Sequence, residues 1–179
     1  MTTAVFENEV VTTAKVRFLQ HPGVAGEIAL ITLDNGHDHT RPSTFGPGGL
    51  ASLDAALDEI AAHPPAPAAI AVTGKPFVFA VGADLSGVPA ITSAADAREI
   101  AETGHRVFRR LKDSTIPTFA FVNGAAMGGG LELALHCTYR TISSGVPAVL
   151  RSSACSGSWL KEKKVRAPKA LVRSAWRRR

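Results

Sequence analysis

The sequence has 179 residues, of which 45% are hydrophobic, and a formal net charge of +5. This length fits one domain with its own core and is short for two. The sequence contains no run of about 18 apolar residues and no basic-then-apolar N-terminal pattern, so we expect neither a membrane span nor a secretory signal. Two cysteines, Cys137 and Cys155, are too few for a disulfide framework and favour a cytoplasmic protein.

The charge is distributed unevenly along the chain. Residues 1–150 carry 10 Lys and Arg against 14 Asp and Glu, whereas residues 151–179 carry the other 10 basic residues against one acid. We therefore expect a mildly acidic domain over residues 1–149 and a basic, irregular or disordered tail over residues 150–179. Nonspecific nucleic-acid binding by this tail is an alternative, but the tail carries no recognition motif, so we expect no specific nucleic-acid partner and no membrane partner.

Hydrophobic periodicity predicts strands and helices in alternation. The expected elements are, in chain order, strands over 8–19 and 27–33, a helix over 50–62, a strand over 69–73, a helix over 93–112, a strand over 118–122 and a helix that follows the glycines at 128–130. The helix over 93–112 opens with Ser93 and Asp96 at capping-box spacing. This order of elements predicts an α/β fold.

The glycine-rich segment between the last strand and the last helix is the first candidate for function. Gly128, Gly129 and Gly130 follow one another at the strand-to-helix junction, where each costs conformational entropy. Glycines that open a helix leave N–H groups free at the positive end of its dipole, where they can hold an anion or a developing oxyanion. Glu132 follows within the first turn. N–H donors and a carboxylate in one turn predict chemistry on a carbonyl compound.

A second glycine-bearing loop, over 74–88, also follows a predicted strand. It contains Gly82, Ala83 and Asp84. Because the loops at the carboxyl ends of parallel strands meet at one edge of a sheet, the two glycine loops are expected to lie together.

Other interpretations of these residues remain open. Glu132 could be a solvated acid of the first helical turn, and Asp84 could cap the following turn rather than contact a substrate. His37 and His39 flank an aspartate, but a third ligand is not in register, so we expect no metal site. The sequence shows no Ser/His/Asp arrangement and no P-loop.

The two segments Phe79–Leu85 and Asn123–Leu133 together resemble the crotonase (enoyl-CoA hydratase/isomerase) superfamily. The resemblance covers roughly residues 8–149. It implies a crotonase-like superhelix of ββα turns, truncated in this chain. The long loop over 34–47 resembles hydratase-like proteins whose relatives are sometimes fused to a 3-hydroxyacyl-CoA dehydrogenase.

The resemblance also implies roles for individual residues. The backbone N–H groups of Ala83 and Gly129 would form an oxyanion hole for a thioester enolate, and Glu132 would be the first of two catalytic carboxylates. The remaining expected substrate-binding residues are Asp84, Leu85, Ser86 and Gly128. The implied substrate is an acyl-CoA thioester in fatty-acid β-oxidation, with no separate cofactor because coenzyme A is part of the substrate.

The sequence departs from the family pattern after about Val149. Family hydratases carry a second glutamate about 20 residues after the first, where this sequence has Ser152 and Ser153. The later family segments, which build a trimer or hexamer, are missing, and the abrupt change in composition suggests a shifted reading frame. Two functions remain: an enoyl-CoA hydratase-like enzyme, with isomerase or other enolate chemistry as a variant, or an impaired remnant that binds acyl-CoA or oligomerises without efficient turnover.

Overall fold

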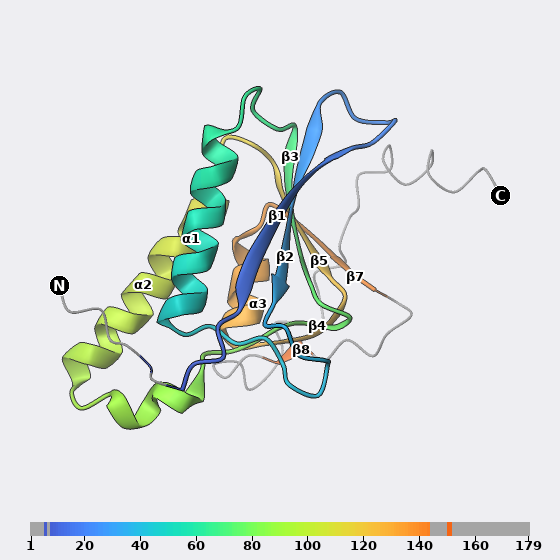
Figure 1. Cartoon of the computed structure of the whole chain (residues 1–179). Coiled ribbons are helices and arrows are strands. Elements are labelled where there is room, and N and C mark those ends of the chain that lie inside the picture. The colour runs from blue at the N-terminus through green and yellow to red at the C-terminus, as the bar shows by residue number, and fades with distance from the viewer. Residues whose placement is uncertain (1–5, 7, 144–149, 152–179) are drawn as a thin grey trace.

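The computed structural model of the protein describes residues 6, 8–143 and 150–151 (Figure 1). Its strands are β1 (Thr13–Gln20), β2 (Glu27–Asp34), β3 (Ala69–Gly74), β4 (Phe77–Val81), β5 (Thr118–Val122), β6 (Gly124–Met127), β7 (Tyr139–Ile142) and β8 (Leu150–Arg151). Its helices are α1 (Pro47–Ala62), α2 (Ala94–Lys112) and α3 (Gly129–His136), with a short 3-10 helix, η1 (Leu85–Ala90).

The strands form two sheets, and from β3 onward consecutive strands alternate between them. One sheet has the order β1-β2-β3-β5-β7 and the other the order β4-β6-β8. The pairs β3/β4, β5/β6 and β7/β8 therefore each contribute one strand to each sheet. Apart from the antiparallel β1–β2 hairpin, all the pairings are parallel. This ββα winding confirms the expected crotonase-like α/β fold.

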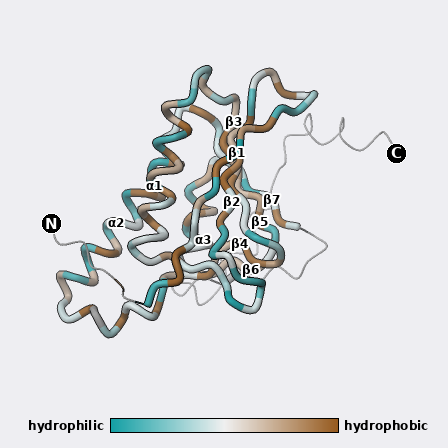
Figure 2. Tube along the Cα trace, viewed as in Figure 1, coloured by the Kyte–Doolittle hydropathy of each residue, from teal (hydrophilic) through white to brown (hydrophobic). Residues whose placement is uncertain are grey.

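The helices cover one side of the five-stranded sheet, and the core lies between the helices and this sheet (Figure 1). Hydrophobic and hydrophilic residues alternate along α1 and α2, as the periodicity predicts (Figure 2). The buried core residues from these elements include Ile31, Leu33, Leu53, Ile60, Val107 and Leu111. None of the helices in the described part of the chain is long and apolar enough to span a membrane.

Several predicted boundaries were wrong. The first strand begins at Thr13 rather than at residue 8. Glu9 instead binds the N-terminus of α1, where its carboxylate accepts from the N–H groups of Gly48 (2.9 Å) and Gly49 (2.8 Å). The same helix begins at Pro47, three residues before the predicted start. The segments of β4, β6, β7 and β8 were not predicted as strands.

The predicted helix over 93–112 is confirmed, with its capping box. The hydroxyl of Ser93 accepts from the Asp96 N–H at 3.1 Å, and the Asp96 carboxylate accepts from the Ser93 N–H at 2.9 Å. Of the predicted tail, Leu150 and Arg151 form β8, which pairs with β6, and residues 152–179 lie outside the described residues. The predicted domain boundary after Val149 stays a prediction.

Candidate functional site

Each of the three consecutive glycines before and within α3 has a different structural environment. Gly128 has φ +49°, a conformation that other residues rarely adopt. A Cβ on Gly130 would lie 1.9 Å from the carbonyl oxygen of Ala80, so only glycine lets the helix start this close to β4. A Cβ on Gly129 would find its nearest neighbour, Gly82, at 3.7 Å, which is an ordinary contact. The fold therefore requires two of the three glycines and leaves Gly129 without a steric reason.

The two glycine loops lie against each other, backbone to backbone. The Gly82 N–H donates to the carbonyl oxygen of Met127 at 2.7 Å. A Cβ on Gly128 would lie only 3.3 Å from the Cα of Gly82. Because β4 and β6 are parallel neighbours, their following loops emerge side by side, as the sequence predicts.

A third segment, Ser43–Phe45, brackets the first glycine loop. The carbonyl oxygen of Ser43 accepts from the Val81 N–H at 2.7 Å, and the carbonyl oxygen of Phe45 accepts from the Asp84 N–H at 2.9 Å. The Phe45 N–H in turn donates to the carbonyl oxygen of Gly82 at 3.0 Å. The sequence analysis missed this segment, and its one signal is an apolar Phe45 (5% exposed) within a polar loop.

These bonds use the N–H groups on both sides of Ala83 but not its own. Among the described residues, no oxygen accepts from the N–H of Ala83 or of Gly129. The first intrahelical bond of α3 runs from Glu132 N–H to the Gly128 carbonyl oxygen at 3.0 Å, so Gly129 is one of the positions whose N–H a helix leaves unpaired. Ala83 is exposed and Gly129 half-buried, so both N–H groups belong to residues that solvent reaches.

The other predicted site residues lie on the first glycine loop, on η1 and in the first turn of α3. Glu132 lies in the first turn of α3 and is exposed. The carboxylate of Asp84 accepts from the Ser86 N–H at 2.9 Å and so caps η1, in agreement with the capping alternative. Leu85 is 75% exposed and Ser86 is exposed. The structure thus gathers the predicted residues on the loops around α3 and η1, and their roles toward a substrate stay predictions.

The electrostatics around α3 favour negative charge at its N-terminus. The positive end of the helix dipole lies at Gly129, where an oxyanion would be stabilised. At the other end, the guanidinium of Arg140 donates to the carbonyl oxygens of Leu135 (3.2 Å) and Cys137 (2.6 Å). A helix N-terminus of this kind can stabilise a carbonyl oxygen that gains charge, and Glu132, in the first turn of the same helix, is a carboxylate that can carry a proton.

The described residues offer neither a reactive cysteine nor a metal-binding cluster. Burial raises the pKa of the Cys137 thiol to about 12, so this cysteine is unsuited to nucleophilic chemistry. No group of three or more His, Cys, Asp or Glu side chains suited to a metal ion occurs in the part of the chain that the structure describes. The absence of a metal from the function stays a prediction.

Comparison with known proteins agrees with the motifs. The family model described as enoyl-CoA hydratase/isomerase matches residues 24–146. The fatty acid oxidation complex subunit alpha of Shewanella halifaxensis is 39% identical over 130 residues, which cover 68% of this chain and 18% of that protein. The corresponding subunit of Shewanella loihica is 38% identical over 125 residues, which cover 69% of this chain and 17% of that protein. The chain thus spans less than a fifth of the length of these curated relatives.

Solved structures show the same fold. DspI of Pseudomonas aeruginosa aligns with a TM-score of 0.61 and 32% identity, over 80% of this chain and 55% of that one. An enoyl-CoA hydratase/isomerase from Xanthobacter autotrophicus Py2 aligns with a TM-score of 0.62 and 26% identity, over 78% of this chain and 49% of that one. With the family model matched over most of the described residues, the chain belongs to the enoyl-CoA hydratase/isomerase family.

Proposed function

We propose that the protein binds a 2-enoyl-CoA thioester and adds water across its C2–C3 double bond, with syn stereochemistry. The observation that carries this proposal is the pair of adjacent loops in which the N–H groups of Ala83 and Gly129 have no acceptor among the described residues, while the neighbouring N–H groups do. The thioester oxygen would accept from both N–H groups. Negative charge develops on that oxygen as the enolate forms, so the two bonds strengthen toward the transition state.

In the proposed reaction, Glu132 handles the proton. Its carboxylate orients a water molecule and takes one proton as the water oxygen bonds to C3 of the substrate. The electron pair of the double bond moves to the thioester oxygen, giving the enolate. Glu132 then returns the proton to C2, so that one water molecule is added in total. Asp84, Leu85, Ser86 and Gly128 would line the acyl-CoA.

The second candidate is an acyl-CoA-binding protein with little turnover. It is favoured by the serines, Ser152 and Ser153, at the place where family hydratases carry a second glutamate; both lie outside the described residues. A single carboxylate must then perform both proton transfers.

Assembly into a homo-oligomer, which the family resemblance implies, is a further prediction that light scattering measures. The cytoplasmic location also stays a prediction.

Incubation with crotonyl-CoA separates the two candidates. Hydration removes the conjugated thioester absorbance, and Glu132→Gln should abolish this loss while leaving binding of butyryl-CoA intact, because a saturated thioester needs the N–H groups but no proton transfer. Turnover that depends on Glu132 supports the hydratase. Binding without turnover supports the second candidate, and the absence of both refutes the proposal.

A further inference from the structure

Lys75 is a lysine that the site does not use and that the fold nevertheless buries. It follows β3, and the residue is 5% exposed. Its ammonium donates to Oδ1 of Asn35 and to the carbonyl oxygens of His37 (2.9 Å) and Arg41. No ion pair joins it to a carboxylate within the described ranges. Burying a lysine without a paired charge is costly, and here only three hydrogen bonds to oxygen offset that cost. The burial of Lys75 therefore requires an explanation.

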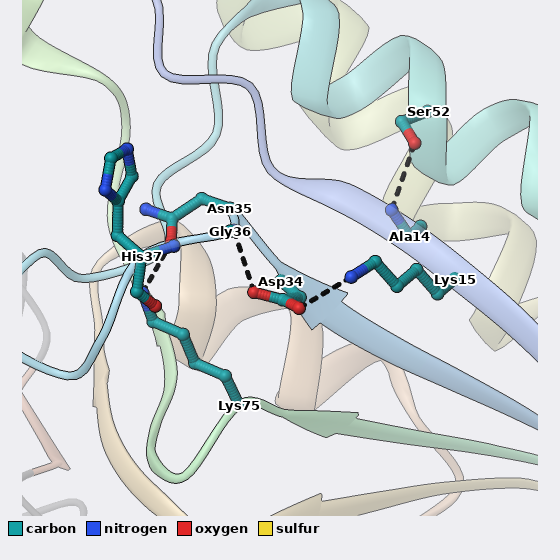
Figure 3. Close-up of polar contacts among 8 residues, drawn as sticks. All are labelled: Ala14, Lys15, Asp34, Asn35, Gly36, His37, Ser52 and Lys75. Carbon is teal, nitrogen blue, oxygen red and sulfur yellow. Dashed lines mark hydrogen bonds and ion pairs between the residues drawn. The ribbon is translucent and has the colours of Figure 1, made fainter.

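The three oxygens come from one loop, residues 35–42, which surrounds the ammonium. The amide of Asn35 also donates to the carbonyl oxygens of Arg41 (3.3 Å) and Pro42 (3.1 Å), which joins the two ends of the loop. Figure 3 shows Asn35, His37 and Lys75 together at the end of β2, and nearby Lys15 paired with Asp34. Burial lowers the pKa of Lys75, an effect that Asp34 and Asp38 oppose.

This loop leads directly into Ser43–Phe45, the segment that brackets Ala83. Ser43 and Phe45 accept from the N–H groups of Val81 and Asp84, and Phe45 donates to Gly82, so the segment fixes the backbone on both sides of Ala83. Since the loop and the segment are continuous, the position at which Lys75 holds the carbonyl oxygen of Arg41 limits where Ser43 can lie.

The main chain of Lys75 is itself anchored. Its N–H donates to the carbonyl oxygen of Leu33 at 3.1 Å, and its carbonyl oxygen accepts from Nδ2 of Asn123 at 2.8 Å. Asn123 immediately precedes β6, the strand that leads to Gly128 and Gly129. Lys75 therefore connects Asn123, which precedes the strand of the second glycine loop, with loop 35–42, which leads to the segment Ser43–Phe45.

We propose that Lys75 is a positioning residue that aligns the N–H of Ala83 with that of Gly129, by holding loop 35–42 and through it the segment Ser43–Phe45. The consequence for catalysis rests on the proposed function; the structural coupling does not. Lys75 contacts no substrate in this account. Its effect passes from the ammonium to loop 35–42, along the chain to Ser43–Phe45, and then through the backbone hydrogen bonds of that segment.

The test is amide hydrogen exchange, followed by NMR, in Lys75→Met. Methionine keeps most of the side-chain volume and removes the three N–H donors. We expect the N–H groups of Val81 and Asp84, which donate to Ser43 and Phe45, to exchange at least about tenfold faster. The N–H of Gly82 donates to Met127, at the end of β6, and should keep its exchange rate. Lys15→Met is the matched control. Lys15 lies on β1, is exposed and pairs with Asp34 at the end of β2, at 2.7 Å; its substitution should change none of the three rates.

Unchanged exchange at Val81 and Asp84 would overturn the proposal, and so would equal acceleration at Gly82, since that indicates general loosening. If Lys75→Met is recovered only unfolded, Asn35→Ala, which removes one of the three oxygens, carries the same test. Butyryl-CoA titrations of the wild type and Lys75→Met add the functional arm, with an expected rise in Kd of about tenfold. If the wild type binds no acyl-CoA, the proposed function fails, and the exchange rates still decide the role of Lys75.

Discussion

Alanine substitutions at the adjacent residues Gly129 and Gly130 should change stability in opposite directions. In Gly130→Ala the new Cβ would lie 1.9 Å from the carbonyl oxygen of Ala80, and also 2.5 Å from its carbonyl carbon. Relieving this contact requires α3 or β4 to move by roughly 1.5 Å. Both partners are backbone, so no side chain can rotate away. Overpacking of this kind costs about 2–3 kcal/mol or more, which exceeds the gain in helix propensity of up to about 1 kcal/mol.

In Gly129→Ala the new Cβ would have its nearest neighbour at 3.7 Å, and Gly129 has no positive φ. Reduced freedom of the unfolded chain should then raise stability by about 0.4–1 kcal/mol. Urea unfolding, monitored by circular dichroism, measures both variants against the wild type. Equal destabilisation by the two substitutions would refute the assignment of the close helix–strand contact to Gly130 alone.

Three further predictions concern residues outside the site. Glu9→Ala removes the carboxylate that caps α1 and should lower stability by about 1 kcal/mol in urea unfolding. The control Glu99→Ala, at an exposed position of α2, should leave stability unchanged. In a Cys155→Ser variant, Cys137 should resist Ellman's reagent at pH 8 until the chain is unfolded, because burial raises its pKa to about 12. Rapid labelling of the native protein would contradict this. Burial by itself would raise the pKa of Asp54, but hydrogen bonds from Arg110 and Arg106 keep this pKa below its usual value.

The pH dependence of Asp54 has a definite sign. A carboxylate whose folded-state pKa is lowered contributes stability that is present above its unfolded pKa, near 3.9 on average, and is lost as the pH falls through the folded-state value. Asp54→Asn should therefore reduce the loss of Tm between pH 5 and pH 3. An unchanged acid slope would show that this ion pair is screened by solvent.

Local signals in the sequence predicted the helices well. The helix over 93–112 has a side-chain cap, an amphipathic pattern and basic residues in its last turn, and all of these act within a few residues. The strands β4 and β6 carry weaker signals. β6 consists of Gly124, Ala125, Ala126 and Met127, which have little intrinsic preference for strands. Pairing with β4 imposes its conformation, and that pairing is a tertiary contact.

The candidate site divides in the same way. Both glycine loops could be predicted, because glycine and a following helix are local features. The segment Ser43–Phe45 could not, since its bonds to Val81 and Asp84 join parts of the chain almost 40 residues apart. The sequence predicts that these glycines leave N–H groups free to hold an anion, whereas the structure shows that Gly128 serves a turn and Gly130 a close contact, which leaves Gly129 for that role.

The central claim is that the N–H groups of Ala83 and Gly129 bind one thioester oxygen. It is tested most directly by a ¹H–¹⁵N titration with butyryl-CoA, in which each backbone N–H is observed separately. The account predicts that the Ala83 and Gly129 signals move downfield together, with one common Kd, while those of Gly82 and Asp84, already bonded to Met127 and Phe45, move little. Saturable binding that leaves the Ala83 and Gly129 signals in place would contradict it.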